Sequence, residues 1–244
     1  MKERLDVLLV NRGLCASRER AKRLILAGEV TADGKLITKP GSSVSSDVTI
    51  SLKEKLRYVG RGGLKLERAI EVYQISVKDT ICLDIGCSTG GFTDCLLQSG
   101  ARKVFAIDVG TNQFAWKLRN DSRVQLREKF NARYLKETDL PDPIDICVVD
   151  VSFISLTKIL EPALEVMKPG GDLICLIKPQ FELERADVGK GGIVRDSALH
   201  RKAIEKIHQF ANGLKYATWQ DVVESPITGA EGNREFLAWI KRKR

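Results

Sequence analysis

The stretch at residues 80–92 constrains the fold of this chain more than any other. Its apolar run ends in an acid, Asp84, and then breaks into glycines, first Gly86 and then the pair at 90–91. Glycine lets the backbone approach a bound group closely, and the residues from Phe92 onward have helical spacing. The pattern predicts a buried strand, a tight turn and a helix start, which is where an α/β sheet binds a nucleotide-like cofactor.

The residues of this turn favour a cationic cofactor over a pyrophosphate. A dinucleotide fold has the order G-x-G-x-x-G, whereas this chain has Ser88 in place of the second glycine and Asp84 in front. A carboxylate would repel a pyrophosphate but suits the amino group and sulfonium of S-adenosylmethionine. The order D-x-G-x-[GS]-x-G resembles the first motif of Rossmann-like methyltransferases. Taken alone, an ordinary strand-to-helix turn is the alternative interpretation.

Three further predicted strands end in charged residues and lie at 103–108, 144–150 and 173–178, and a weaker one is expected at 124–126. Two more are expected at 221–224 and 235–240, the last one antiparallel because a short loop precedes it. The carboxyl ends of parallel strands share one edge, so Asp108, Asp150 and Lys178 should surround one cleft with the turn. The expected fold class is α/β, a Rossmann-like class I methyltransferase domain with a seven-stranded, mostly parallel sheet.

The expected cofactor site combines this turn with the ends of the next two strands. Asp108 lies 24 residues after Asp84, a spacing that suits a carboxylate accepting hydrogen bonds from ribose hydroxyls. The predicted cofactor-binding residues are Asp84, Gly86, Ser88, Thr89, Gly90, Gly91, Phe92, Asp108 and Asn131. No metal is expected.

The N-terminal part reads as a small α+β module with a basic surface. Residues 1–66 carry 14 Lys and Arg against 7 Asp and Glu, and two short helices precede a hairpin turn at 33–34. The order Arg4-Leu5-Asp6, Ser17-Arg18 and Asp33-Gly34-Lys35 resembles the small RNA-binding domain of a ribosomal small-subunit protein, tyrosyl-tRNA synthetases and pseudouridine synthases. A merely solvated charged face is the alternative. The RNA-binding candidates are Arg4, Arg18, Arg20, Lys22, Arg23, Arg61 and Lys190.

Three segments follow from this division. We expect an RNA-binding domain at 1–57, a glycine-rich linker at 58–66 and the methyltransferase domain at 67–244. The six cysteines include no C-x-x-C and are expected to be reduced core residues, and His200 and His208 are expected on the surface. No run is long enough to span a membrane, and the charged start predicts a cytoplasmic protein.

The motifs together are similar to one family. The stretches at 62–66, 83–94, 149–156, 177–182 and 188–196 resemble the TlyA family, which comprises ribosomal RNA ribose 2′-O-methyltransferases with an FtsJ-like catalytic domain, often labelled haemolysin A. The resemblance implies a Lys-Asp-Lys-Glu tetrad at Lys65, Asp150, Lys178 and Glu235. Glu231, in the same loop as Glu235, stays open as the fourth member. The resemblance also implies a cytidine ribose of ribosomal RNA or its subunits as the substrate.

The tetrad suits this chemistry, because attack by a weakly acidic ribose hydroxyl needs the hydroxyl to be oriented and its proton accepted. Whether Lys178 acts as a base or only orients the hydroxyl stays open. Pyrimidine carbon-5 enzymes need a nucleophilic cysteine, whereas Cys147 and Cys175 lie inside predicted strands. Two other functions are considered: a membrane-lytic haemolysin, for which no amphipathic or spanning segment is found, and a non-catalytic RNA-binding factor.

Overall fold

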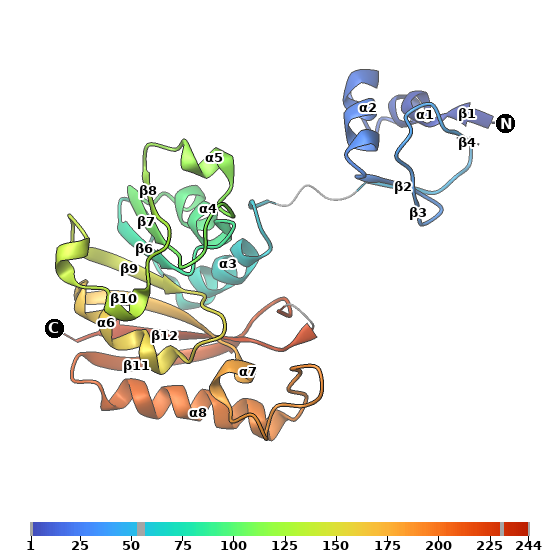
Figure 1. The fold of residues 1–244 in the computed structure, drawn as a ribbon. Coiled ribbons are helices and arrows are strands. Elements are labelled where there is room, and N and C mark those ends of the chain that lie inside the picture. The colour runs from blue at the N-terminus through green and yellow to red at the C-terminus, as the bar shows by residue number, and fades with distance from the viewer. Residues whose placement is uncertain (1, 53–56, 230–231, 244) are drawn as a thin grey trace. The chain divides into compact units, whose positions relative to one another are not determined.

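The structure is a computed structural model that describes residues 2–52, 57–229 and 232–243. The chain divides into two compact units, Met1–Leu56 and Arg57–Arg244 (Figure 1). Each unit has its own buried apolar clusters. The chain therefore consists of two domains, each of which buries its own core.

The N-terminal unit packs two helices against short strands, as the sequence predicts. Its elements are β1 (Lys2–Arg4), α1 (Leu5–Asn11), α2 (Arg18–Leu26), β2 (Val30–Ala32), β3 (Lys35–Leu36), β4 (Ser43–Ser45) and β5 (Ile50–Leu52). Ser17 caps α2, because its hydroxyl accepts a hydrogen bond from the backbone N–H of Arg20 at 3.3 Å. β2 and β3 form the predicted antiparallel hairpin. Leu5, Leu9 and Ile25 form the centre of the core.

The second unit alternates strands and helices around one sheet. Its helical elements are α3 (Gly62–Tyr73), α4 (Gly91–Gln98), α5 (Trp116–Arg119), η1 (Ala132–Tyr134), η2 (Glu137–Asp139), η3 (Leu156–Lys158), α6 (Leu160–Glu165), α7 (Pro179–Glu182) and α8 (Ser197–Gly213). Its strands are β6 (Ile81–Ile85), β7 (Lys103–Ile107), β8 (Val124–Arg127), β9 (Ile144–Val149), β10 (Met167–Ile177), β11 (Ala217–Glu224) and β12 (Phe236–Arg242).

The sheet has the predicted seven strands, and the last of them runs antiparallel, as predicted. The strand order is β11-β12-β10-β9-β6-β7-β8, in which β6 to β10 run parallel and β12 runs antiparallel to both of its neighbours. Successive side chains of a strand point to opposite faces, so Leu83 packs with α6 and α8 whereas Cys82 packs with α3 and α4. Helices therefore cover both faces, and the α/β prediction is confirmed (Figure 1).

The domain boundary differs from the prediction at the glycine-rich stretch. Residues 58–66 belong to the second unit, which begins at Arg57, and α3 begins at Gly62 rather than after a linker. The glycines serve close packing, because a Cβ on Gly62 would lie 3.4 Å from the ring of Phe92 on α4, and a Cβ on Gly91 of α4 would lie 3.0 Å from the backbone nitrogen of Gly63. Glycine therefore marks a contact between α3 and α4 here, not a flexible connection.

Two buried features correct or confirm smaller predictions. All six cysteines are free and buried, as expected. His200, expected on the surface, is instead buried in α8, where its Nε2 lies 2.9 Å from the carbonyl oxygen of Val194.

Over the described ranges, none of the helices combines the length and apolar character that crossing a membrane requires.

Candidate active site

The glycine turn after β6 forms one wall of a cavity at the carboxyl edge of the sheet. Gly86 has a φ of +83°, and a Cβ there would collide with the carbonyl oxygen of Asp150. The turn lines the cavity with Gly86, Cys87, Ser88, Thr89, Gly91 and Phe92, and other segments add Arg61, Gly62, Lys65 and Asp150. Gly90 lies in the turn but not in this lining. The predicted turn is thus open to a ligand.

A second cavity of about 360 Å³ continues across the ends of β7 and β8. Asp108 lines it, and its two carboxylate oxygens accept hydrogen bonds from the backbone N–H groups of Ser88 at 2.8 Å and Gly110 at 2.7 Å. Each oxygen retains a lone pair for a ligand hydroxyl. Phe130 and Asn131 also line this cavity, which shares Gly86, Ser88 and Asp150 with the first. The two cavities are therefore parts of one cleft.

The four predicted tetrad residues form two ion pairs at this edge. Lys178 Nζ lies 2.6 Å from Asp150 Oδ1, and Lys65 Nζ lies 2.5 Å from Glu235 Oε2. Both lysine side chains are 10% exposed, and the Glu235 side chain is 3% exposed. Lys65, Lys178 and Glu235 line a third cavity that adjoins the cleft. Glu235 directly precedes β12 instead of opening it, and Glu231 lies outside the described residues.

The loop after β9 adds two residues that the sequence did not single out. Ser152 Oγ accepts a hydrogen bond from Lys178 Nζ at 2.9 Å. Phe153 is 91% exposed with a φ of +63°, a conformation that is rare for a bulky side chain, and its ring lies 5.1 Å from that of Phe181. Phe153 borders both the second and the third cavity. A phenylalanine in a sequence does not by itself indicate that its ring is exposed to solvent.

The buried carboxylate of Glu182 fixes the far end of this loop. It accepts hydrogen bonds from the backbone N–H of Leu156 at 2.8 Å and from Ser155 Oγ at 2.5 Å, and Lys206 Nζ lies 3.2 Å away. Glu182 lies on α7, the one-turn helix that follows Lys178. The loop and Lys178 are therefore held by the same short element.

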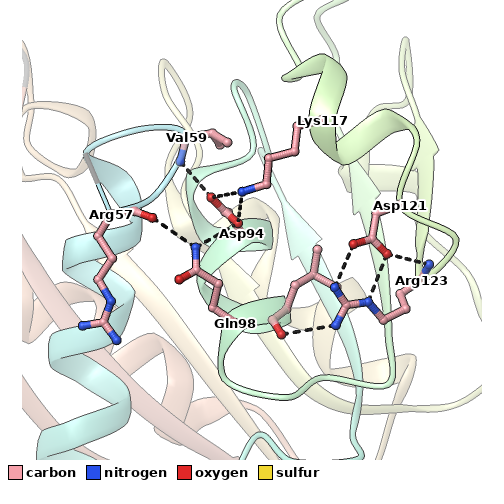
Figure 2. A network of polar contacts seen from close by, with 8 residues as sticks. Arg57, Val59, Asp94, Gln98, Lys117, Asp121 and Arg123 are labelled. Carbon is pink, nitrogen blue, oxygen red and sulfur yellow. Dashed lines mark hydrogen bonds and ion pairs between the residues drawn. The ribbon is translucent and has the colours of Figure 1, made fainter. Parts of the chain in front are cut away.

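A polar network fastens the segment before α3 against α4 (Figure 2). The buried Asp94 carboxylate accepts hydrogen bonds from the backbone N–H of Val59 at 2.9 Å, from Gln98 Nε2 at 3.1 Å and from Lys117 Nζ at 3.2 Å. Gln98 Nε2 also donates to the carbonyl oxygen of Arg57. The network places the residues just before α3, which carries Lys65, beside the helix that begins with the glycine turn.

Asp84 departs from its predicted place in the cleft. Its carboxylate is completely buried, is absent from the cavity linings, and accepts a hydrogen bond from Thr93 Oγ1 at 2.6 Å. Burial raises its pKa to about 7. Its second oxygen has no hydrogen-bond partner among the described residues. The sequence placed Asp84 at the right edge, but the packing turned its side chain inward.

The predicted RNA-binding residues fall into three places. Arg4, Arg18, Arg20, Lys22 and Arg23 lie in the N-terminal unit, Arg61 lines the cleft, and Lys190 is exposed on a glycine-rich loop. Two of the first group, Arg4 and Arg18, share the carboxylate of Asp6.

Thiol chemistry receives no support from the cleft residues. Cys87 lines the cleft, but burial raises the pKa of its thiol well above the usual range, as it does for Cys147 and Cys175. Within the part of the chain that the structure describes, no group of three or more His, Cys, Asp or Glu side chains is placed to hold a metal ion.

Comparisons with known families match both units. The FtsJ-like methyltransferase family matches residues 58–242, and the S4 domain matches residues 3–50. Hemolysin A of Brachyspira hyodysenteriae is 46% identical over 240 residues, which cover 96% of this chain and 98% of the relative. The 16S/23S rRNA (cytidine-2′-O)-methyltransferase TlyA of Mycobacterium tuberculosis is 40% identical over 240 residues, which cover 98% and 89%.

A solved structure supports the same grouping. A hemolysin-named protein from Streptococcus thermophilus has 45% sequence identity and a TM-score of 0.75, with 99% of this chain and 89% of that chain covered. An S-adenosylmethionine-dependent methyltransferase from Mesorhizobium loti, at 15% identity and a TM-score of 0.51, covers 75% of this chain and 100% of its own, and it shows the likeness of fold alone.

Proposed function

Because the chain belongs to the FtsJ-like methyltransferase family, we propose that it transfers a methyl group from S-adenosylmethionine to a ribose 2′-hydroxyl of ribosomal RNA. A cytidine is the proposed target, since the TlyA relative carries that nucleoside in its name. The S4 domain supports RNA as the substrate. The observation that carries the proposal is the pair of lysine–carboxylate ion pairs beside the glycine turn.

The cleft residues fit the cofactor in shape and in hydrogen-bonding chemistry. Gly86, Ser88 and Asp150 line both parts of the cleft, so the turn borders the space that a ligand would fill. Asp108 would accept hydrogen bonds from the ribose hydroxyls, and Asn131 and Phe130 would flank the adenine. When bound, S-adenosylmethionine supplies a methyl group activated by its sulfonium.

The two ion pairs restrict Lys65 and Lys178, which supports a role for these lysines in orienting the ribose hydroxyl. Asp150 Oδ1 and Ser152 Oγ fix Lys178 Nζ from two directions, and Glu235 fixes Lys65 Nζ. Preorganised groups of this kind lower the cost of aligning the reacting atoms. We assign to Lys178 the orientation of the 2′-hydroxyl, and to the exposed ring of Phe153 a stacking surface for the target nucleoside.

A methyl-transfer assay tests the reaction and the substrate together. Ribosomal subunits are isolated from a strain that lacks this gene and incubated with the protein and radiolabelled S-adenosylmethionine, and the label is mapped by nuclease digestion. The proposal predicts label at an alkali-resistant ribose. Bound cofactor with no label on either subunit or on whole ribosomes would contradict it in favour of a non-catalytic RNA-binding factor.

A pair of lysine variants on β10 and its end tests the assignment of Lys178. Lys178→Ala is expected to abolish methyl transfer while cofactor affinity changes less than about threefold, because its Nζ contacts Asp150 and Ser152 and not the glycine turn. Lys168→Ala, at the opposite end of the strand and paired with Asp145, is the matched control and should retain activity. A Lys178→Ala protein with wild-type turnover refutes the assignment.

A further inference from the structure

Asp6 in the N-terminal unit is a buried carboxylate whose partners are exposed. Its side chain is 0% accessible, yet it binds two arginines whose side chains are 51% and 52% exposed. Arg4 donates from Nε to Oδ1 and from Nη2 to Oδ2, both at 3.0 Å, and Arg18 donates from Nε to Oδ2 at 2.9 Å. The two guanidinium groups therefore meet on one carboxylate.

Three elements of the unit converge to build this contact. Arg4 ends β1, Asp6 lies in the first turn of α1, and Arg18 is the first residue of α2. The Arg4 guanidinium lies close to Gly41, where a Cβ would come within 3.2 Å of Nη1. Hydrogen bonding to Arg4 lowers the pKa of Asp6 to about 2, so the carboxylate stays ionised at neutral pH.

We propose that Asp6 is a positioning residue that holds Arg4 and Arg18 together as one preformed clamp for an RNA phosphate. Of the five N–H donors of a guanidinium, Arg4 uses two on Asp6 and Arg18 uses one, so most of them remain available. Guanidinium forks match phosphate geometry, and side chains that are already fixed lose less entropy on binding. The inference rests on the proposed RNA substrate.

The direction in which Asp6→Asn changes RNA affinity distinguishes this positioning role from general electrostatic attraction. Asp6→Asn removes a negative charge from a basic surface, so general attraction to RNA would make binding equal or tighter. If Asp6 positions the arginines, binding instead weakens, because both side chains become mobile. We expect about a tenfold loss of affinity, with an unchanged slope of log affinity against log salt, because the arginines still reach phosphates.

The experiment measures the affinity of the full chain for large ribosomal subunits from a strain lacking the gene, over a salt series. Glu19→Gln is the matched control: it makes the same charge change at a side chain that is 77% exposed and paired with Lys22, and it should not weaken binding. Arg4→Gln should weaken binding and also lower the salt slope by about 0.9 or less.

Two outcomes overturn the inference without touching the proposed function. One is an Asp6→Asn protein that binds as tightly as Glu19→Gln. If circular dichroism shows that Asp6→Asn does not fold, Gly41→Val decides, because it leaves Asp6 intact and displaces the Arg4 guanidinium; binding equal to wild type then overturns the inference. Failure of the wild-type protein to bind or methylate subunits refutes the proposed function instead.

Discussion

Replacing Lys65 with methionine should destabilise the second unit by about 3–5 kcal/mol. The substitution leaves the Glu235 carboxylate 3% exposed and without the ammonium that lies 2.5 Å away. A buried charge that loses its partner keeps its full desolvation penalty, and measured losses for such pairs fall in this range. With a urea m-value of about 2–3 kcal/mol/M, the midpoint of unfolding should fall by about 1.5 M.

The companion variant distinguishes the ion pair from the packing around it. Lys65→Met/Glu235→Met removes both charges and keeps chains of similar length, so its stability should return to within about 1 kcal/mol of wild type. Methyl transfer should be absent from both variants. The double variant should therefore be stable but inactive. If the ion pair had only a structural role, restoring stability would also restore methyl transfer.

Tryptophan fluorescence during urea unfolding measures this effect on the second unit alone, because Trp116, Trp219 and Trp239 all lie in it. Arg234→Met is the control: it breaks the neighbouring ion pair to Glu224, whose side chains are 48% and 45% exposed, and should cost less than about 1 kcal/mol. A Lys65→Met protein with the wild-type midpoint would refute the argument from burial, as would a double variant no more stable than the single one.

Two further predictions follow from the turn after β6. Burial raises the pKa of Asp84 to about 7 against 3.8 for an ordinary aspartate, so the folded state is stabilised below pH 4 and loses that stability as pH rises to 7. In urea unfolding, the free energy of unfolding of Asp84→Asn relative to wild type should therefore be higher at pH 8 than at pH 5 by on the order of 2–3 kcal/mol. The same difference at both pH values would contradict the raised pKa of the buried carboxylate. Gly86→Ala should abolish cofactor binding in a calorimetric titration, because its Cβ collides with Asp150, whereas Gly191→Ala, with positive φ but nothing within 4 Å, should bind normally.

The number of strands, the antiparallel direction of the last one and the shared edge of charges were readable from the sequence. Apolar runs that stop at an acid or a lysine give both the strand and its direction, and parallel strands must end at one edge. The structure confirms the seven strands and the antiparallel direction of β12. The same local logic predicted the Ser17 cap and the hairpin of the N-terminal unit. Strand ends, helix caps and hairpin turns depend on residues that are close together in the sequence, so they can be predicted from it.

Only the tertiary structure decided which way the side chains at that edge point and what they meet. Asp84 turns into the core while Asp108 faces the cleft, and Phe153 lies exposed although it is apolar. Lys65 meets Glu235 from 170 residues away. Burial and pairing are set by packing between distant segments, which spacing along the chain does not record. The sequence therefore determined which residues lie at this edge of the sheet, and the tertiary packing determined their orientation, burial and partners.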